Sequence, residues 1–598
     1  MTNPIWRRPS LFIGILSAFG LLAAIACGSS PTPTATSVPP TATATPRPAT
    51  PTPTTAPGTT ATVVAQPTAT ATATPTPVPS VQPKRGGVIK QNAAEDPPSF
   101  DAHNATSAAH NIYNQKMYQT LVWNPNGSAI VPDAAESYSV SSDGKVWTFK
   151  LRPDIKYFTG YTPAFDRDGT TMTAKDVAYS LKKIMGLTDG VVSARSGWMK
   201  EFIDIDRPDN GMEVVDPLTL KIHLTQPFSG LITLLAIGYS GIMPEGVTQA
   251  MLARRPYGSG PFKVDLATSQ RGALWKLKRN PDYFKQGLPY LDEWQFVLMD
   301  GTAIAQAAFL THKTDVSGGY ATPDNEAIYN KRIAAGEFYQ LPYASDCRPG
   351  SVNMNTTKPP FSDKKLREAV NLAIDRNAYM QVVQNFGHGY PALYLTTGGW
   401  GKTAEEILKL PGWAQTRDTK DAEVAKAKQI VSELYPKGLD VKMMARNTSG
   451  YMIQNEFIAG ELRKIGLNVT IEAQDTNLVF DRAVKLDYAI WSYWFCQTTN
   501  TPEELFGSYF VTGGSRNWIG YSNPNIDKGY REMAAMSDPA AKKKKAMEME
   551  DLVLSSLTAV PLPDSLTTRT AYSYVKDLPM TITQYSREKN ELAWRSDV

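Results

Sequence analysis

The sequence predicts an α/β fold, in which β-sheets are covered by helices. Residues 144–152 alternate apolar and polar side chains, which is typical of a half-buried strand. The apolar residues Val177, Leu181 and Ile184 have the spacing of one helix face. Residues 458–465 also have a helical pattern, which Gly466 ends before the strand-like residues 467–471. Strands and helices therefore interleave along the chain.

Further elements follow from local signals. Residues 86–91 form a strand pattern directly after Lys84 and Arg85. Thr173 is expected to cap a helix, with Asp176 in the first turn, where a carboxylate interacts favourably with the helix dipole. Ser362 is expected to cap a later helix. The apolar stripe of that helix consists of Leu366, Ala369, Val370, Ala373 and Ile374.

The N-terminus has the pattern of an export signal. Arg7 and Arg8 precede an apolar run over residues 11–26, which is too short for a comfortable membrane span. The run ends in small residues before Cys27, as in a bacterial lipobox, so residues 1–27 are predicted to be a lipoprotein signal peptide with Cys27 as the acylated residue. An ordinary cleaved signal or a one-pass anchor are the alternatives. All three place the rest of the chain outside the cytoplasm.

Residues 28–83 are dominated by Pro, Thr, Ala, Ser and Val. Such a segment cannot bury enough apolar surface to offset the entropy of ordering it. Its prolines favour extended conformations that reach on the order of 170 Å. The sequence therefore predicts a disordered tether.

The remaining residues are numerous enough for more than one domain. A net charge of +4, scattered over 598 residues, gives no case for nucleic acid, and the run of lysines at 542–545 is interpreted as the solvated face of a helix. Apart from Cys27, the cysteines are Cys347 and Cys496, which can pair in an oxidising compartment.

Motifs for catalysis are missing from the sequence. It has no His-Glu-x-x-His motif and no Gly-x-Ser-x-Gly elbow. Residues 396–403 end like a phosphate-binding loop, but Thr396 stands where the first glycine is required. The five histidines are not clustered, so no metal site and no cofactor are expected.

Short motifs in a fixed order resemble the extracellular solute-binding proteins of family 5, which bind oligopeptides, dipeptides or nickel. Together they extend over nearly everything after the tether. They are residues 85–87, 143–152, 173–177, 258–262, 279–284, 360–369, 373–376 and 520–524.

This resemblance implies an α/β fold of the periplasmic-binding-protein-like type II, in the large two-lobed cluster C form with an extra inserted domain. Two crossing segments, near residues 352–355 and 559–562, would form the hinge. The first lobe would comprise residues 84–130, 256–350 and 558–598, the inserted domain residues 131–255, and the second lobe residues 351–557.

In such a protein the ligand lies between the lobes, where aromatic rings supply contact area and polar groups fix orientation. The densest aromatic candidate is residues 491–497, with Trp491, Tyr493, Trp494 and Gln497 as ligand contacts. The cluster follows the strand-like residues 486–490, so it is expected at a strand end that faces the cleft. The alternative is that Trp491 and Tyr493 pack the core of the second lobe.

Five further candidates lie in segments that resemble the family's ligand-lining loops. Glu95 or Asp96 could meet a cationic group, and Arg348 could pair with a carboxylate. Trp400 and Trp413 could supply apolar contact area. The alternative for each is a surface charge or a packing tryptophan.

In the oligopeptide-binding branch, a tryptophan and a cysteine precede an aspartate that pairs with the ligand's amino group. Here Trp494 and Cys496 are followed by Gln497, whose neutral amide cannot supply that charge-assisted bond. Ordinary peptides with free N-termini are therefore less expected as ligands. The same branch implies a disulfide between Cys347 and Cys496; two buried free thiols are the alternative.

The expected function is capture of a small ligand, either a peptide-like compound or another small polar solute. The ligand would be delivered to the permease subunits and ATPase of an ABC importer. The protein would be a monomer, anchored by lipid to the outer face of the cytoplasmic membrane. The alternatives are an extracytoplasmic hydrolase, and a sensory or chaperone-like binding protein on the same fold.

Overall fold

The structure is a computed structural model. It describes residues 82–97, 99–104, 108–125, 130–189, 193, 196–319, 321–344, 347–383, 389–396, 398–497, 499, 501–579 and 589–598. The predicted signal peptide, the acylated Cys27 and nearly all of the tether lie outside these residues.

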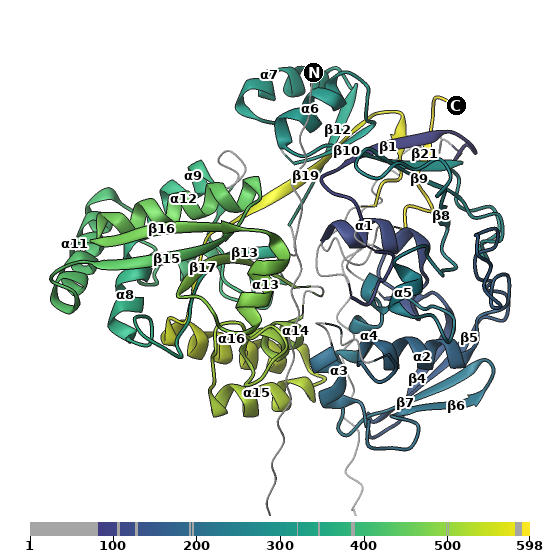
Figure 1. The fold of residues 1–598 in the computed structure, drawn as a ribbon, viewed down its shortest axis with the longest axis horizontal. Helices are drawn as coiled ribbons and strands as arrows, with labels where there is room; N and C mark the ends of the chain where they lie inside the picture. The colour runs from purple at the N-terminus through teal and green to yellow at the C-terminus, as the bar shows by residue number, and fades with distance from the viewer. Residues whose placement is uncertain are drawn as a thin grey trace, which may run out of the picture. The chain divides into compact units, whose positions relative to one another are not determined.

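The largest sheet has eight strands (Figure 1). β1 (Val88–Ala93) lies parallel to β10 (Glu293–Leu298), which confirms the first predicted strand. The helix α1 (Ala108–Met117) packs against this sheet. Its side chains Tyr113 and Met117 belong to the same apolar cluster as the buried residues of the sheet. The other strands are β8 (Phe262–Val264), β9 (Leu274–Arg279), β11 (Val316–Gly318), β12 (Phe338–Ala344), β19 (Asp564–Tyr572) and β14 (Gly389–Tyr390). The helices α6 (Thr302–Leu310) and α7 (Pro323–Ala334) lie beside β11 and β12.

A four-stranded antiparallel sheet lies between β1 and β8 in the chain. Its strands are β4 (Ala135–Val140), β5 (Val146–Leu151), β6 (Met212–Asp216) and β7 (Thr219–His223). In β5 every second side chain is buried, as predicted. α2 (Ala174–Ile184) packs on β6 and β7. The Asp176 carboxylate accepts a bond from the Thr173 amide (2.7 Å), which confirms Thr173 as the cap.

Short helices follow in the same part of the chain: α3 (Ser196–Phe202), α4 (Leu231–Leu234), η1 (Gly238–Ser240) and α5 (Gln249–Leu252).

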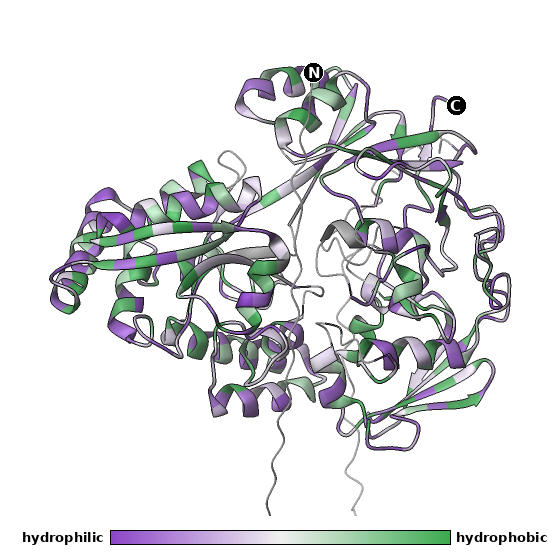
Figure 2. Cartoon of the chain, viewed as in Figure 1, coloured by the Kyte–Doolittle hydropathy of each residue, from purple (hydrophilic) through white to green (hydrophobic). Residues whose placement is uncertain are grey.

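The third large sheet has five strands. They are β13 (Cys347–Met354), β15 (Leu439–Arg446), β16 (Leu467–Gln474), β17 (Ile490–Cys496) and β18 (Ala559–Pro561). α8 (Lys364–Ala373), α11 (Arg417–Leu434) and α12 (Ser449–Lys464) pack around it in one apolar core. In Figure 2, hydrophobic and hydrophilic residues are interleaved along these helices, as expected for elements with one buried side.

The remaining helices of this region are α9 (Arg376–Val382), α10 (Ala404–Ile407), α13 (Thr476–Val484), α14 (Pro502–Leu505), the π-helix η3 (Phe506–Phe510), α15 (Pro524–Ala534) and α16 (Pro539–Ser556).

Two predictions about helices were wrong. The cap of α8 is Asp363, whose carboxylate accepts from the Lys365 amide (2.8 Å), and not Ser362. The lysine run is not one solvated face, because four consecutive helical residues spread around most of the helix circumference. Lys543 and Lys544 are exposed, whereas Lys542 is 8% exposed.

In the described part of the chain, two connections lead between the eight-stranded and five-stranded sheets. One joins β12 to β13, and the other joins β18 to β19. Everything between these connections belongs to the five-stranded side, except that β14 pairs with β19.

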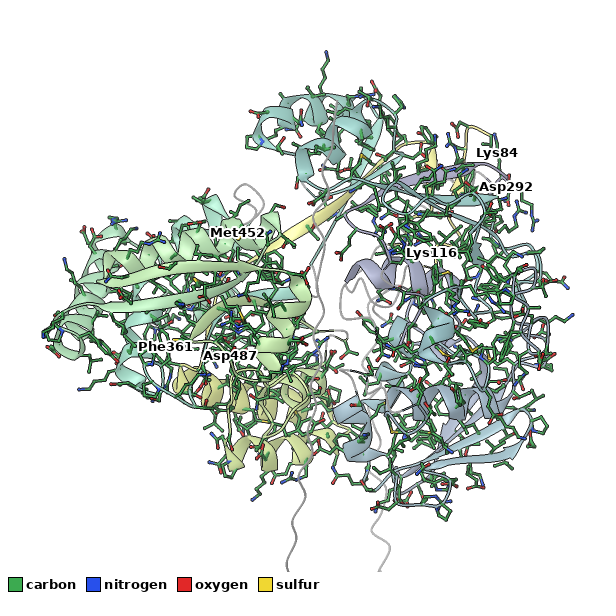
Figure 3. All side chains as sticks on the ribbon, in the orientation of Figure 1. Lys84, Lys116, Asp292, Phe361, Met452 and Asp487 are labelled. Atoms are coloured by element: carbon green, nitrogen blue, oxygen red, sulfur yellow. The ribbon has the colours of Figure 1, made fainter. Side chains whose placement is uncertain are left out.

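The two ends of the folded part meet. Lys84 donates from Nζ to the carbonyl oxygens of Ser596 and Val598 (both 2.8 Å), close to Asp292 (Figure 3). β20 (Val575–Lys576) and β21 (Trp594–Arg595) pair near this end of the chain.

Candidate functional site

The aromatic cluster at residues 491–497 forms a strand, not the segment after one. β17 begins at Ile490, and Leu486 adopts a left-handed turn conformation (φ 51°), so the predicted strand at 486–490 was wrong. Alternation along β17 puts Trp491, Tyr493 and Phe495 on one face, with exposed fractions of 1%, 3% and 3%.

These three side chains have the contacts of packed core residues. The rings of Trp491 and Tyr493 stack at 4.9 Å, and Phe480 meets Tyr493 edge-on at 5.8 Å. This packing corresponds to the core alternative stated for Trp491 and Tyr493.

The opposite face of β17 is polar. The Ser492 hydroxyl donates to Asn455 Oδ1 (3.0 Å) and accepts from Gln454 Nε2 (2.8 Å). Gln454 Oε1 in turn accepts from the Tyr379 hydroxyl (2.7 Å). Trp494 belongs to this face, is half-buried, and packs its ring 4.5 Å from that of Tyr451. Trp494 is therefore the most accessible of the predicted aromatic contacts in β17.

Gln497 directly follows β17 and is 6% exposed. Its amide nitrogen donates to the Tyr394 carbonyl (2.8 Å). The Tyr394 hydroxyl donates to the Ala559 carbonyl (2.7 Å). Gln497 thus connects the end of β17 to a loop that is itself bonded to β18.

The two predicted acidic contacts differ in their environment. The Asp96 carboxylate accepts from Trp275 Nε1 (2.7 Å) and from the Gly272 amide (2.9 Å), so it already holds β9 beside the end of β1. The Glu95 side chain is exposed. Its backbone carbonyl accepts from the Tyr113 hydroxyl (3.2 Å), and burial raises the pKa of Tyr113 above its usual range.

The predicted tryptophan contacts outside β17 also differ. Trp413 is 2% exposed and packs in a small apolar cluster, with the Arg376 guanidinium 4.8 Å from its ring centre. Burial lowers the pKa of Arg376 to about 10, and its nitrogens donate to the Asn371 and Gly412 carbonyls. Trp400 is half-buried against the largest apolar cluster.

Cys347 and Cys496 are paired in the register of β13 and β17. Their side chains, like that of Arg348, lie outside what the structure describes.

Sequence reasoning missed a pair of asparagines on α1. Tyr113 and Lys116 occupy the sheet side of this helix, with Lys116 Nζ 5.0 Å from the Trp294 ring centre (Figure 3). Asn111 and Asn114, three residues apart, turn to the other side. Both are almost fully buried, at 1% and 0% exposed, and neither amide makes a hydrogen bond with any described residue.

Buried amides normally have partners, because an unmade bond is unfavourable by about 1–3 kcal/mol. The two side chains therefore have amide donors and acceptors on one helix face that no described residue uses. The signal in the sequence was the i, i+3 spacing of two residues that are uncommon inside helices.

The described residues include neither a metal-binding cluster nor a helix that could span a membrane. They contain no group of three or more His, Cys, Asp or Glu side chains placed to hold a metal ion. Within the same ranges, no helix combines the length and the apolar character needed to cross a membrane.

Comparison with known proteins places this architecture. A family model described as bacterial extracellular solute-binding proteins, family 5 Middle, matches residues 129–517. The glutathione-binding protein GsiB of Salmonella paratyphi A is 25% identical over 480 residues, covering 78% of this chain and 86% of GsiB. The periplasmic oligopeptide-binding protein OppA of Haemophilus influenzae is 24% identical over 516 residues, covering 82% of this chain and 90% of OppA.

Solved structures agree. The periplasmic binding protein DppA of Helicobacter pylori, in complex with the peptide STSA, superposes with a TM-score of 0.72 at 19% identity, covering 86% of this chain and 98% of DppA. AgaA from A. tumefacien R10, in complex with agropinic acid, gives a TM-score of 0.69 at 24% identity, covering 85% and 99%. These likenesses confirm the predicted two-lobed α/β fold of periplasmic binding proteins.

GsiB and OppA are named as binding proteins, and DppA is described as a periplasmic binding protein associated with an ABC transporter; substrate-binding proteins of this kind are not enzymes. The family match extends over well more than half of the sequence. The chain therefore belongs to the bacterial extracellular solute-binding proteins of family 5.

Proposed function

We propose that this protein is a lipid-anchored receptor that captures a small solute between its two lobes and delivers it to the permease of an ABC importer. The observation that carries the proposal is the family match over residues 129–517. The export signal, Cys27 and the tether over residues 28–83 support a location at the outer face of the cytoplasmic membrane.

The mechanism follows from the two connections between the large sheets. A ligand that touches both lobes gains all of its contacts only when the lobes close around it, so it favours the closed form. Closure presents a surface to the permease, whose ATPase drives transport. No covalent step is involved.

The proposed ligand contacts are the predicted residues that the structure leaves exposed or half-buried, namely Glu95, Trp400 and Trp494, together with Arg348, whose side chain lies outside the described part. Asn111 and Asn114 join them. Asp96, Trp413, Trp491, Tyr493 and Gln497 have packing or hydrogen-bonding roles within the fold that explain them without a ligand.

The proposed ligand is a peptide-like compound or another small polar solute. Relatives are named for glutathione and oligopeptides, and one solved neighbour holds agropinic acid. The oligopeptide-binding branch has an aspartate where this chain has Gln497, so no carboxylate stands at this position to select a free N-terminal ammonium. Asn111 and Asn114 favour groups that both donate and accept hydrogen bonds, such as hydroxyls and amides.

Mass spectrometry of material released from the denatured, purified protein is the direct test. The refolded protein should then show a saturable change in tryptophan fluorescence with the identified compound. If no compound is released, and if fluorescence stays flat across a panel of peptides, sugars, opine-like acids and chelates, the proposal is wrong.

A further inference from the structure

A buried ion pair lies where the two sides of the molecule touch away from the strand connections. Lys542 of α16 donates from Nζ to Glu503 Oε1 of α14 (2.5 Å) and to the Ser229 hydroxyl (2.7 Å). Lys542 is 8% exposed and Glu503 is 3% exposed. The pair is therefore largely removed from water.

Ser229 belongs to the other side of the molecule. It lies between β7 and α4, in the chain segment that precedes β8, whereas Lys542 and Glu503 lie between β17 and β18. The Ser229 amide also donates to the Ala534 carbonyl (3.3 Å). A Cβ atom on Gly230 would stand 3.6 Å from Glu503 Cδ, so the backbone of residue 230 covers the carboxylate.

Aromatic side chains also pack across this boundary. The Phe202 ring stacks on Phe228 at 4.1 Å and meets the Tyr530 ring edge-on at 5.7 Å. Phe202 and Phe228 come from the side of Ser229, and Tyr530 comes from the side of Lys542. The Phe202–Tyr530 contact therefore crosses the same boundary as the bond between Lys542 and Ser229.

Lys542 and Glu503 belong to the same lobe, so opening the molecule does not separate them. Opening removes Ser229, Gly230 and Phe228 from above them and returns both charges to water. Closing does the reverse, and the removal of charged groups from water is unfavourable. The closed arrangement carries a further penalty, because Glu503 Oε2 is buried without a hydrogen-bond partner in the described residues.

We propose that the Lys542–Glu503 pair, with Ser229 as its partner from the opposite side, sets the open–closed equilibrium of this protein. The pair opposes closure, so a ligand is needed to hold the lobes together. Closure buries the two charges together as a neutral pair. If either charge is removed, closure must bury the other one without its partner. This inference rests on the proposed function for its biological meaning, but its physical content is a property of the ligand-free protein.

The test compares single and double variants by small-angle X-ray scattering of ligand-free, full-length protein. Lys542→Met leaves an unpaired carboxylate that closure would bury, so the ratio of closed to open molecules should fall by about tenfold or more. Lys542→Met combined with Glu503→Met removes both charges, and the radius of gyration should decrease below that of the unmodified protein. Ser229→Ala should shift the equilibrium toward the open form by a smaller factor.

Lys544→Met is the matched control, because Lys544 is exposed on the same helix, and it should change nothing. Glu503→Gln provides a milder variant if Lys542→Met fails to fold, as judged by circular dichroism; it leaves the Lys542 ammonium without its carboxylate partner on closure, so it should move the radius of gyration toward the open value. If the variants lower the free energy of unfolding but leave the radius of gyration unchanged, the pair is only structural and the inference is wrong. Failure to find any ligand would overturn the proposed function without affecting this measurement.

Discussion

Cys347 and Cys496 lie directly opposite each other across the antiparallel strands β13 and β17. Residues so paired have Cα atoms about 4.5–5.5 Å apart, which is within the range that a disulfide spans. We predict that the exported protein contains this disulfide. Alkylation followed by mass spectrometry should modify both cysteines only after reduction, and reduction should lower the free energy of unfolding by about 2–5 kcal/mol. Alkylation of both cysteines in the unreduced protein would contradict the prediction.

Cys27 is predicted to carry the membrane anchor. Cys27→Ala should move the protein from the membrane fraction to the soluble exported fraction, because no acyl chain can then be attached. Immunoblotting of cell fractions is the measurement. Cys347→Ala serves as the control and should stay with the membranes; retention of Cys27→Ala there would rule out the lipid anchor.

Variants of the asparagine pair on α1 can distinguish ligand binding from packing. If Asn111 and Asn114 bind ligand, the double alanine variant should lose affinity for the released compound by about tenfold or more, since two hydrogen-bonding groups are removed. Its free energy of unfolding without ligand should change little or increase, because unpaired buried amides are removed. Asn525→Ala, an exposed position, is the control. Unchanged affinity would leave the pair without a ligand role.

The two faces of β17 should respond differently to truncation. Trp491→Ala removes a buried ring from the core and should destabilise the protein by about 3–5 kcal/mol in urea unfolding. Trp494→Ala removes a half-buried ring and should mainly reduce ligand affinity and the fluorescence response. A large loss of affinity in Trp491→Ala, without destabilisation, would restore the original prediction for that residue.

Glu550 of α16 should make stability depend on pH. It is 0% exposed, its Oε1 accepts from the Leu395 amide (3.0 Å), and burial raises its pKa from 4.5 to about 7. The folded protein therefore binds this proton more tightly than the unfolded chain does. The contribution to stability is fully present below pH 4.5 and is lost as the pH rises through about 7.

Glu550→Gln mimics the protonated group. At pH 8 its free energy of unfolding should be about 1–3 kcal/mol higher than that of the unmodified protein. At pH 4 the two free energies of unfolding should be equal. Glu548→Gln, at an exposed position of the same helix, should not show the crossover. An equal difference at both pH values would show that the Glu550 pKa is not raised.

Much of the fold was predictable because its signals are local. The alternation at residues 144–152, the Thr173 cap and the stop at Gly466 each depend on neighbours in the sequence, and each is present in the structure. The misplaced strand at residues 486–490 failed because the turn conformation of Leu486 is not visible in composition.

The site was harder to predict. A strand such as β17 has the same alternating pattern whether its aromatic face meets a core or a ligand, so Trp491 and Trp494 could not be distinguished. The burial of Lys542 could not be predicted either, because its partners Ser229 and Glu503 are 313 and 39 residues away in the sequence.

The bonds from Lys84 to the carbonyls of Ser596 and Val598 hold the two ends of the folded part next to each other. A short peptide linking these two ends would allow circular permutation, in which the chain is cut at an exposed loop to give new termini and every sheet stays intact. A fluorescent reporter could be inserted at such a cut, near the strand connections between the lobes. The molecule is in this sense already arranged as a scaffold for a genetically encoded sensor of its own ligand.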